Sequence, residues 1–379
     1  MAKRTITYQK PFWQNGWTSI SRVILHCHSL VSKKEISLDI MRDVIIGLFF
    51  TERWNRVLFI SIWIFISTTL FAQEGSPYAL RIVSYNVENL FYPEDDPDIA
   101  DDEFTINHYR RWGYSRYFRK ISQISKAIVA TFPYDYPDIV CLCEIENRQV
   151  LHDLIGSPLL RSANYSIVHR DGPDPRGIDV AFLVRKDKVY LDSISFVEIP
   201  FHEKYFREVV HVAVSWLGSR YHFWGLHLPS NYSGVKKSQQ NRQRCMEYLC
   251  QQIAADRSND CHFIMGDFNT EPTSSCIKYL VNQLGKKGEI LNLICPNKKS
   301  PGTLRYHEFW FLYDMIYLWK KLPENVCVME AKVCNFSFLM EQDSKYGGVK
   351  PKRFFIGYRC QEDGFSDHLP VSIELYFEH

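Results

Sequence analysis

Nine short runs rich in β-branched and aromatic residues recur between residues 80 and 377 of this 379-residue chain. Runs of this length and composition predict β-strands, whereas residues 114–131 and 236–256 repeat their apolar residues at helical spacing. Several strand pairs follow one another closely, which indicates mixed or antiparallel sheets with helices outside them. We therefore predict an α/β fold. The predicted strands are 80–85, 138–144, 165–169, 178–185, 209–216, 221–228, 261–265, 313–318 and 371–377.

The amino-terminal part of the chain has a different character. Residues 57–72 form an uncharged apolar run that follows two arginines and precedes polar sequence. This order is typical of a secretory signal, and the run is shorter than the roughly 20 residues that span a bilayer. We interpret 57–73 as a signal peptide or, alternatively, a membrane anchor, which predicts export to the periplasm or the extracellular space. Residues 1–56 form an extension of doubtful relevance, with Met41 as an alternative start.

The remainder of the chain, residues 78–379, contains no linker, repeat or low-complexity tract, so we predict a single domain there. The whole chain has a net charge of +2, but this domain carries −2, because nine basic and five acidic residues precede it. A nucleic-acid contact would therefore depend on a local patch.

The cysteines exclude two kinds of site. None of the 11 cysteines has CxxC spacing, which argues against zinc-ribbon and thioredoxin-like sites. Cys141 and Cys143 lie within an apolar run, so we expect most cysteines to be small buried hydrophobes. The sequence leaves open whether one or two disulfides form.

Polar residues stand where six of the apolar runs end or begin. Carboxylates, amides and two histidines recur there, and such groups at a sheet edge predict a hard-cation site with acid–base groups beside it. The segments are SYNVEN at 84–89, LCEIEN at 142–147, LHLPS at 226–230, GDFNTEP at 266–272, YDMI at 313–316 and SDHLP at 366–370.

In this order the segments resemble the endonuclease/exonuclease/phosphatase superfamily, which includes pancreatic-type deoxyribonucleases, apurinic endonucleases, inositol-polyphosphate 5-phosphatases and neutral sphingomyelinases. The GDFN-x-x-P and SDH-x-P signatures are the most specific, and the resemblance covers about residues 80–375. It implies a four-layered α/β sandwich, in which two packed mixed β-sheets are flanked by helices. It also implies hydrolysis of phosphate esters with a divalent cation.

By matching positions, the resemblance makes Glu144 the principal metal ligand, with Asn86 and Asp367 near the ion. Oxygen ligands of this kind suit Mg²⁺ or Mn²⁺. Taken alone, Glu144 would be an exposed carboxylate at a strand end, and Asn86 a turn residue that caps its own backbone. Their place in the ordered set of motifs favours the metal site.

The resemblance also implies a group of catalytic residues. Asp267 and Asn269 match the pair beside the scissile phosphate, where the Asp moves a proton and the Asn donates to a phosphate oxygen. Without the family, the same pair would be an Asx-type turn after a strand. His368 matches the family's histidine, and Asp314 matches the carboxylate that orients its ring and fixes its tautomer.

His227 and Arg176 complete the predicted site. The deoxyribonuclease-like branch carries His at the position of His227, whereas apurinic endonucleases carry Tyr, so this chain departs from the repair enzymes. Arg176 is a candidate bidentate donor to phosphate, although an arginine in such a loop is as often a solvated charge. We expect in-line attack of water on phosphorus, with Asp267 or His368 as the base. His227 or metal-bound water would assist the leaving oxygen.

These features predict an exported, divalent-metal-dependent phosphodiesterase, and the first hypothesis is an endonuclease that hydrolyses DNA or RNA. A phospholipid or inositol-phosphate phosphoesterase, similar to sphingomyelinases, is the alternative, because one fold hosts both kinds of substrate. A catalytically silent binding module is a third hypothesis, but every expected polar residue is present, which argues against it. We expect a monomer with no obligate protein partner.

Overall fold

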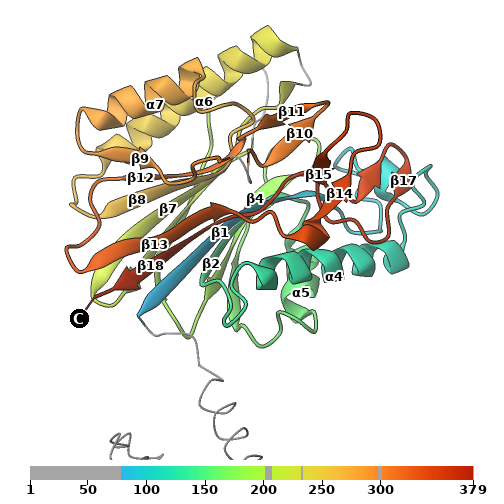
Figure 1. The fold of residues 1–379 in the computed structure, drawn as a ribbon, viewed down its shortest axis with the longest axis horizontal. Coiled ribbons are helices and arrows are strands. Elements are labelled where there is room, and N and C mark those ends of the chain that lie inside the picture. The colour runs from blue at the N-terminus through green and yellow to red at the C-terminus, as the bar shows by residue number, and fades with distance from the viewer. Residues whose placement is uncertain (1–77, 201–206, 232–233, 298–300, 379) are drawn as a thin grey trace, which may run out of the picture. The chain divides into compact units, whose positions relative to one another are not determined.

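The computed structural model describes residues 78–200, 207–231, 234–297 and 301–378. Two six-stranded sheets pack face to face, and helices cover both outer faces (Figure 1). Helices α4 (Tyr114–Ala130) and α5 (Arg148–Gly156) lie on one side, and α6 (Val235–Ala255) and α7 (Ser275–Gly285) lie on the other. The predicted four-layered α/β sandwich is confirmed.

The first sheet has the strand order β13-β18-β1-β2-β4-β3, and β1 and β2 are its one parallel pair. Both strands are buried along almost their whole length, as expected for strands covered on both faces. The strands are β1 (Ala79–Leu90), β2 (Ile139–Ile145), β3 (Tyr165–Val168), β4 (Asp179–Arg185), β13 (Val326–Val333) and β18 (Val371–Phe377).

The second sheet has the order β5-β6-β7-β8-β12-β9, and β7 and β8 are its one parallel pair. Its strands are β5 (Tyr190–Val197), β6 (Val209–Trp216), β7 (Ser219–His227), β8 (Cys261–Asp267), β9 (Ile290–Asn292) and β12 (Asp314–Trp319). Three small hairpins lie outside the two sheets: β10 (Leu304–Tyr306) with β11 (Phe309–Phe311), β14 (Met340–Gln342) with β15 (Val349–Pro351), and β16 (Phe355–Ile356) with β17 (Arg359–Cys360).

Every predicted strand and both predicted helices are present, with ends that shift by a few residues. The prediction missed β5, β9, β13, α5, α7 and the three small hairpins. The strands β5 and β13 are edge strands whose residues are mostly half-buried or exposed. They therefore lack the continuous apolar pattern that marks a buried strand.

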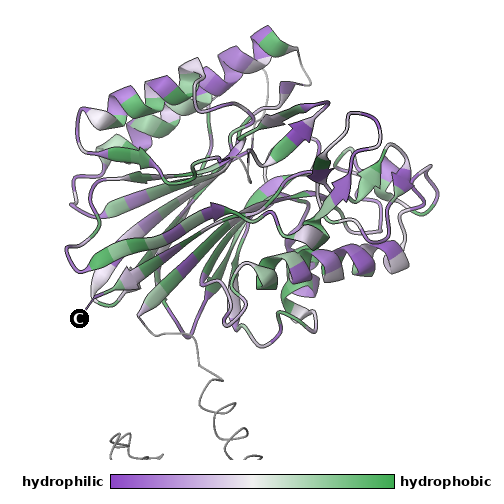
Figure 2. Cartoon of the chain, in the orientation of Figure 1, coloured by the Kyte–Doolittle hydropathy of each residue, from purple (hydrophilic) through white to green (hydrophobic). Residues whose placement is uncertain are grey.

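The interior is apolar, and the cysteines belong to it. Figure 2 shows apolar residues along the strands of both sheets and mostly hydrophilic residues on α6. Within the described part of the chain every cysteine is free, and most are buried. The expectation that cysteines serve as small buried hydrophobes is confirmed for Cys141, Cys143, Cys245, Cys250, Cys261, Cys276 and Cys334.

Among the described residues, no helix is long and apolar enough to cross a membrane. The apolar segment 57–73 and the extension 1–56 lie outside the described residues. The signal peptide or anchor therefore stays a prediction.

Three stacked histidines lie across β6, β7 and β8. The His211 and His222 rings are 5.2 Å apart and nearly parallel, and His222 stacks on His262 at 4.5 Å. His211 Nε2 lies 3.0 Å from His222 Nδ1, and His262 Nε2 lies 3.2 Å from an Asp256 carboxylate oxygen. Burial, together with the neighbouring His222, lowers the pKa of His211 to about 4 and that of His262 to about 3.

This cluster contains residue types that bind metals, but the hydrogen bonding opposes that role. His222, Asp256 and His262 offer ligand atoms within 4.8 Å of one another. The indole N–H of Trp224 donates to His262 Nδ1 at 3.1 Å, so neutral His262 carries its own proton on Nε2. The nitrogen that faces Asp256 is therefore protonated, and a metal ligand needs a lone pair there.

We predict that this cluster makes the fold sensitive to acid. Because the folded-state pKa of His211 lies below its unfolded value of about 6.5, the unfolded chain binds more protons once the pH falls below about 6.5. The free energy of unfolding should fall between pH 7 and pH 5, and His211→Gln should reduce that fall by about 1 kcal/mol. Urea denaturation at the two pH values measures this, and equal falls in both proteins would contradict it.

Candidate active site

The carboxyl ends of the two parallel strand pairs meet at one edge of the sandwich. Asn86 lies where the regular pairing of β1 with β2 stops, Glu144 lies one residue before the end of β2, and His227 and Asp267 are paired at the ends of β7 and β8. Asp314 opens β12 and is paired with Asp267. A hydrogen bond of 2.9 Å from Asn86 Nδ2 to Asp267 Oδ2 joins the two sheets there. The fold thus brings residues from five of the six motifs together.

His368 supplies the sixth motif, and Asp314 orients it. The Nδ1 atom of His368 lies 2.7 Å from Asp314 Oδ2, which leaves Nε2 3.8 Å from Asp267 Oδ2. Burial by itself would lower the pKa of His368, but the Asp314 and Asp267 carboxylates outweigh it and raise that pKa well above its usual value. The backbone N–H of Asp314 donates to Thr303 Oγ1 at 3.1 Å, which holds the start of the strand that carries the orienting carboxylate.

Asp267 is almost fully buried at the centre of this arrangement. The backbone N–H of Asn269 donates to Asp267 Oδ1 at 2.8 Å, and the Asn269 and Asn86 side chains donate to Oδ2 at 3.2 and 2.9 Å. Burial raises the pKa of Asp267 to about 7, against the opposing effect of His368. The predicted Asx turn is therefore present, and it positions the carboxylate within the site.

Gly266 makes this geometry possible. Its φ of +135° lies in a region that side chains disfavour, and a Cβ atom there would lie 1.9 Å from the Leu226 carbonyl oxygen. The glycine of the GDFN motif is thus required by close packing of β8 against β7.

Asn86 and Glu144 form the part of the site that was predicted to bind metal. Asn86 Nδ2 donates to Glu144 Oε1 at 3.2 Å, and the backbone N–H of Asn89 donates to Glu144 Oε2 at 2.7 Å. The amide oxygen of Asn86 accepts from the backbone N–H of Glu88 at 3.0 Å. Asn86 thus presents its NH₂ group to the carboxylates, and it would have to turn its amide over to offer an oxygen to a cation.

The donor atoms nevertheless suit a divalent cation. Glu144 Oε1 and Asp267 Oδ2 both face His227 Nε2, at 3.8 and 3.5 Å, so two carboxylates converge on one point. Asp267, Asp314 and His368 also offer ligand atoms within 4.8 Å of one another. Carboxylate oxygens are the preferred ligands of Mg²⁺ and Mn²⁺.

His227 differs from His368 in its surroundings. Burial and the nearby Arg207 and Arg176 hold the pKa of His227 well below its usual range. Arg207 is buried, donates to the His227 carbonyl oxygen at 3.2 Å, and lies 3.1 Å from Asp174. The sequence analysis missed Arg207, although a charged residue next to a predicted strand was a usable signal. Arg176 is exposed, and its backbone N–H donates to Asp174.

Asp367 does not contact Glu144; it pairs with an arginine that the sequence analysis missed. Arg353 lies 3.2 Å from Asp367 and 2.7 Å from Glu88, and the backbone N–H of Phe354 donates to Glu88 at 2.8 Å. Burial and Asp367 raise the pKa of the Glu88 carboxyl to about 7, although Arg353 opposes them. Glu88 therefore ties the end of β1 to the segment that holds Asp367, the neighbour of His368.

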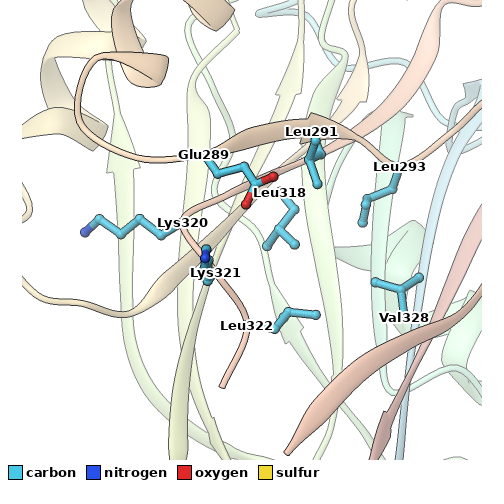
Figure 3. A pocket seen from close by; sticks show the side chains of 8 residues that line it. All are labelled: Glu289, Leu291, Leu293, Leu318, Lys320, Lys321, Leu322 and Val328. Atoms are coloured by element: carbon cyan, nitrogen blue, oxygen red, sulfur yellow. The ribbon is translucent and has the colours of Figure 1, made fainter. Parts of the chain in front are cut away.

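Two hollows in the described structure lie away from these residues. A cavity of about 200 Å³ between β9, β12 and β13 is lined by four leucines and Val328 (Figure 3). Lys320, Lys321 and Glu289 lie at its rim. A second cavity, of about 530 Å³, is lined by residues that include Trp310 and Leu369. Neither lining contains a predicted site residue.

A comparison with protein families matches residues 81–376 to a family described as the endonuclease/exonuclease/phosphatase family. The chain belongs to this family. The resemblance inferred from the six motifs is thereby confirmed, and the protein is a hydrolase of phosphoester bonds that depends on a divalent metal. A comparison with curated proteins finds no significant match.

Solved structures share the fold at low sequence identity. The human Nocturnin catalytic domain with bound sulfate is 16% identical, with a TM-score of 0.50 over 79% of this chain and 95% of that one. A family member from Bacteroides thetaiotaomicron is 17% identical, with a TM-score of 0.50 and 79% and 98% covered. A functionally unknown protein from Enterococcus faecalis V583 is 15% identical, with a TM-score of 0.50 and 79% and 100% covered. These likenesses concern the fold.

We predict that Glu88 acts as a positioning residue for this endonuclease/exonuclease/phosphatase site. Glu88→Gln removes the negative charge that holds Arg353. The loop that carries Asp367 and His368 should then lose its fixed position relative to β1. Turnover should fall about 10-fold to 100-fold, as for other residues that support metal ligands. Steady-state kinetics and calorimetric Mn²⁺ binding measure the effect.

The matched control is Asp138→Asn. Asp138 is a fully buried carboxylate that pairs with Arg185 at 3.4 Å, at the opposite end of β2 from Glu144. The Asp138→Asn variant should lose about as much free energy of unfolding as Glu88→Gln while it keeps the turnover of the unmodified protein. Equal losses of turnover in both variants would show that Glu88 acts only through global stability.

Proposed function

We propose that the protein is an Mg²⁺- or Mn²⁺-dependent phosphodiesterase that cleaves DNA or RNA internally. One observation carries this proposal: two imidazoles flank the buried Asp267 carboxylate, with His227 Nε2 at 3.5 Å and His368 Nε2 at 3.8 Å. Hydrolysis of a phosphodiester needs a proton taken from water and a proton given to the departing alkoxide. Proton-carrying groups on both sides of one carboxylate suit that task.

The two histidines differ in charge, which gives them different roles. His368, held by Asp314 at 2.7 Å, favours the charged imidazolium and donates to a phosphate oxygen. His227 favours the neutral ring, whose Nε2–H can donate a hydrogen bond to the leaving oxygen while a water molecule supplies the proton that the departing alkoxide takes up. Two groups of one type, tuned apart by their surroundings, are a recurring sign of acid–base catalysis.

Asp267 is the base that we assign. Its Oδ2 accepts hydrogen bonds from two amides, and this one oxygen lies near the Nε2 atoms of both imidazoles. Asn269 lies beside it and orients the carboxylate. Glu144, with Asp367 and Asn86 nearby, would hold the cation, which when bound supplies positive charge to the phosphate oxygens. Arg176 and Arg207 would add further positive charge at the His227 side.

We extend the proposal to the location and state of the protein. The apolar segment 57–73, preceded by arginines and followed by polar residues, supports export, with membrane anchoring as the alternative. We expect a monomer whose partner is its substrate.

The first test is nicking of supercoiled plasmid by the purified protein with Mg²⁺, with Mn²⁺ or with chelator. Nicking should need the metal, and His368→Ala should reduce it about 10²- to 10⁴-fold, as expected for loss of an acid–base group. His152→Ala, an exposed histidine on α5, is the matched control and should nick normally.

Metal binding separates the remaining hypotheses. Glu144→Gln should lose divalent-metal binding in titration calorimetry, whereas His368→Ala should keep most of it. A folded, metal-binding protein that hydrolyses sphingomyelin or inositol phosphates but leaves the plasmid intact would replace the nuclease with the lipid or inositol-phosphate alternative. An unmodified protein that binds no divalent metal would favour the silent module.

A further inference from the structure

Three aromatic rings form a continuous stack on the surface. The rings of Tyr306 and His307 lie 4.1 Å apart at 21°, and those of His307 and Tyr346 lie 4.7 Å apart at 33°. Tyr306 is 64% exposed, and Phe309, its partner in the β10–β11 hairpin, is 61% exposed. Rings this accessible contribute little to the core, so their arrangement calls for another explanation.

An arginine joins the two hairpins that carry the stack. Arg305 donates to the Gly347 carbonyl oxygen at 2.7 Å and to the Val349 carbonyl oxygen at 3.0 Å, and its side chain is only 6% exposed. These bonds join the β10–β11 hairpin to the β14–β15 hairpin, which carries Tyr346 on its turn. Rings fixed before binding lose little entropy when a ligand stacks on them.

The stack stands beside the catalytic histidine. Leu304 forms an antiparallel bridge with His368, and Thr303, which accepts the Asp314 N–H, immediately precedes it. Tyr306 follows two residues later, on the order of 7 Å along the strand. Figure 1 shows the two hairpins next to each other at one end of the sandwich. A nucleotide next to a phosphate held at His368 can therefore reach the rings.

We propose that Tyr306, His307 and Tyr346 form a stacking platform for single-stranded nucleic acid, in which the outer rings of Tyr306 and Tyr346 receive the bases and His307 between them holds the two tyrosines in place. This inference rests on the proposed nuclease function and narrows its substrate to unpaired strands, because bases inside a duplex cannot present their faces to protein rings. Base–aromatic stacking is the usual way in which proteins hold single strands without reading their sequence. Lys345, whose ammonium lies 4.9 Å from the Tyr346 ring, adds a positive charge for the backbone.

The experiment measures binding and cleavage separately with the full protein. Fluorescence anisotropy in EDTA gives the affinity for a labelled single-stranded oligonucleotide, and cleavage of the same oligonucleotide is followed with Mg²⁺. Tyr306→Ala combined with Tyr346→Ala should weaken binding at least about 5-fold, the lower end expected for one lost stacking contact. Tyr134→Ala, an 85% exposed tyrosine before β2, is the matched control and should bind normally.

A second arm removes the bases instead of the rings. An oligonucleotide with abasic residues should bind the unmodified protein more weakly, and the double variant should then cause no further loss. Full cleavage with equal affinities in variant and unmodified protein would overturn the platform while leaving the nuclease proposal intact. If the unmodified protein cleaves neither oligonucleotide nor plasmid but hydrolyses bis-p-nitrophenyl phosphate, the nuclease proposal fails and the platform fails with it.

Discussion

The parallel pairing of β1 with β2 and of β7 with β8 is the constraint on which the site depends. Parallel strands direct their carboxyl ends to the same edge, and face-to-face packing of the two sheets brings both edges together. The hydrogen bond from Asn86 to Asp267 marks the point where they meet. Polar residues that end four separate strands can therefore surround one substrate atom, while the strand interiors remain apolar and hold them rigidly.

Burial then determines what these polar residues can do. In a low-dielectric interior, burial disfavours the charged form of an imidazole and charged neighbours shift its pKa strongly. His227, where Arg207 adds to the effect of burial, therefore favours the neutral form, whereas His368 favours the charged form because Asp314 and Asp267 outweigh burial. The Glu88–Arg353 pair lies behind the residues that would contact the substrate, and Arg353 also pairs with Asp367. The pair joins the end of β1 to the loop before β18, so that an ion pair between buried Glu88 and half-exposed Arg353 fixes the spacing between the metal side and the histidine side of the site.

Much of the fold could be predicted because burial leaves a local record in sequence. The central strands are continuous apolar runs, and α4 and α6 repeat apolar residues at helical spacing. Edge strands such as β5 and β13 are half exposed and leave no such record. Among the site residues, those in motifs at strand ends were recognisable, whereas Arg207 and Arg353 lie in no motif and were missed.

The sequence by itself determined the strand runs, the family, and the residue types at the ends of those runs. These include Gly266, directly before Asp267, whose backbone conformation is one that residues with a side chain rarely adopt. Only the tertiary structure decided which charges meet. Glu88 and Arg353 are 265 residues apart, and Asp314 and His368 are 54 apart. Such partners, like the stack of Tyr306, His307 and Tyr346, depend on sheet register and on how separate hairpins pack. Local sequence pattern records whether a residue is buried; it does not record which distant residue it will face.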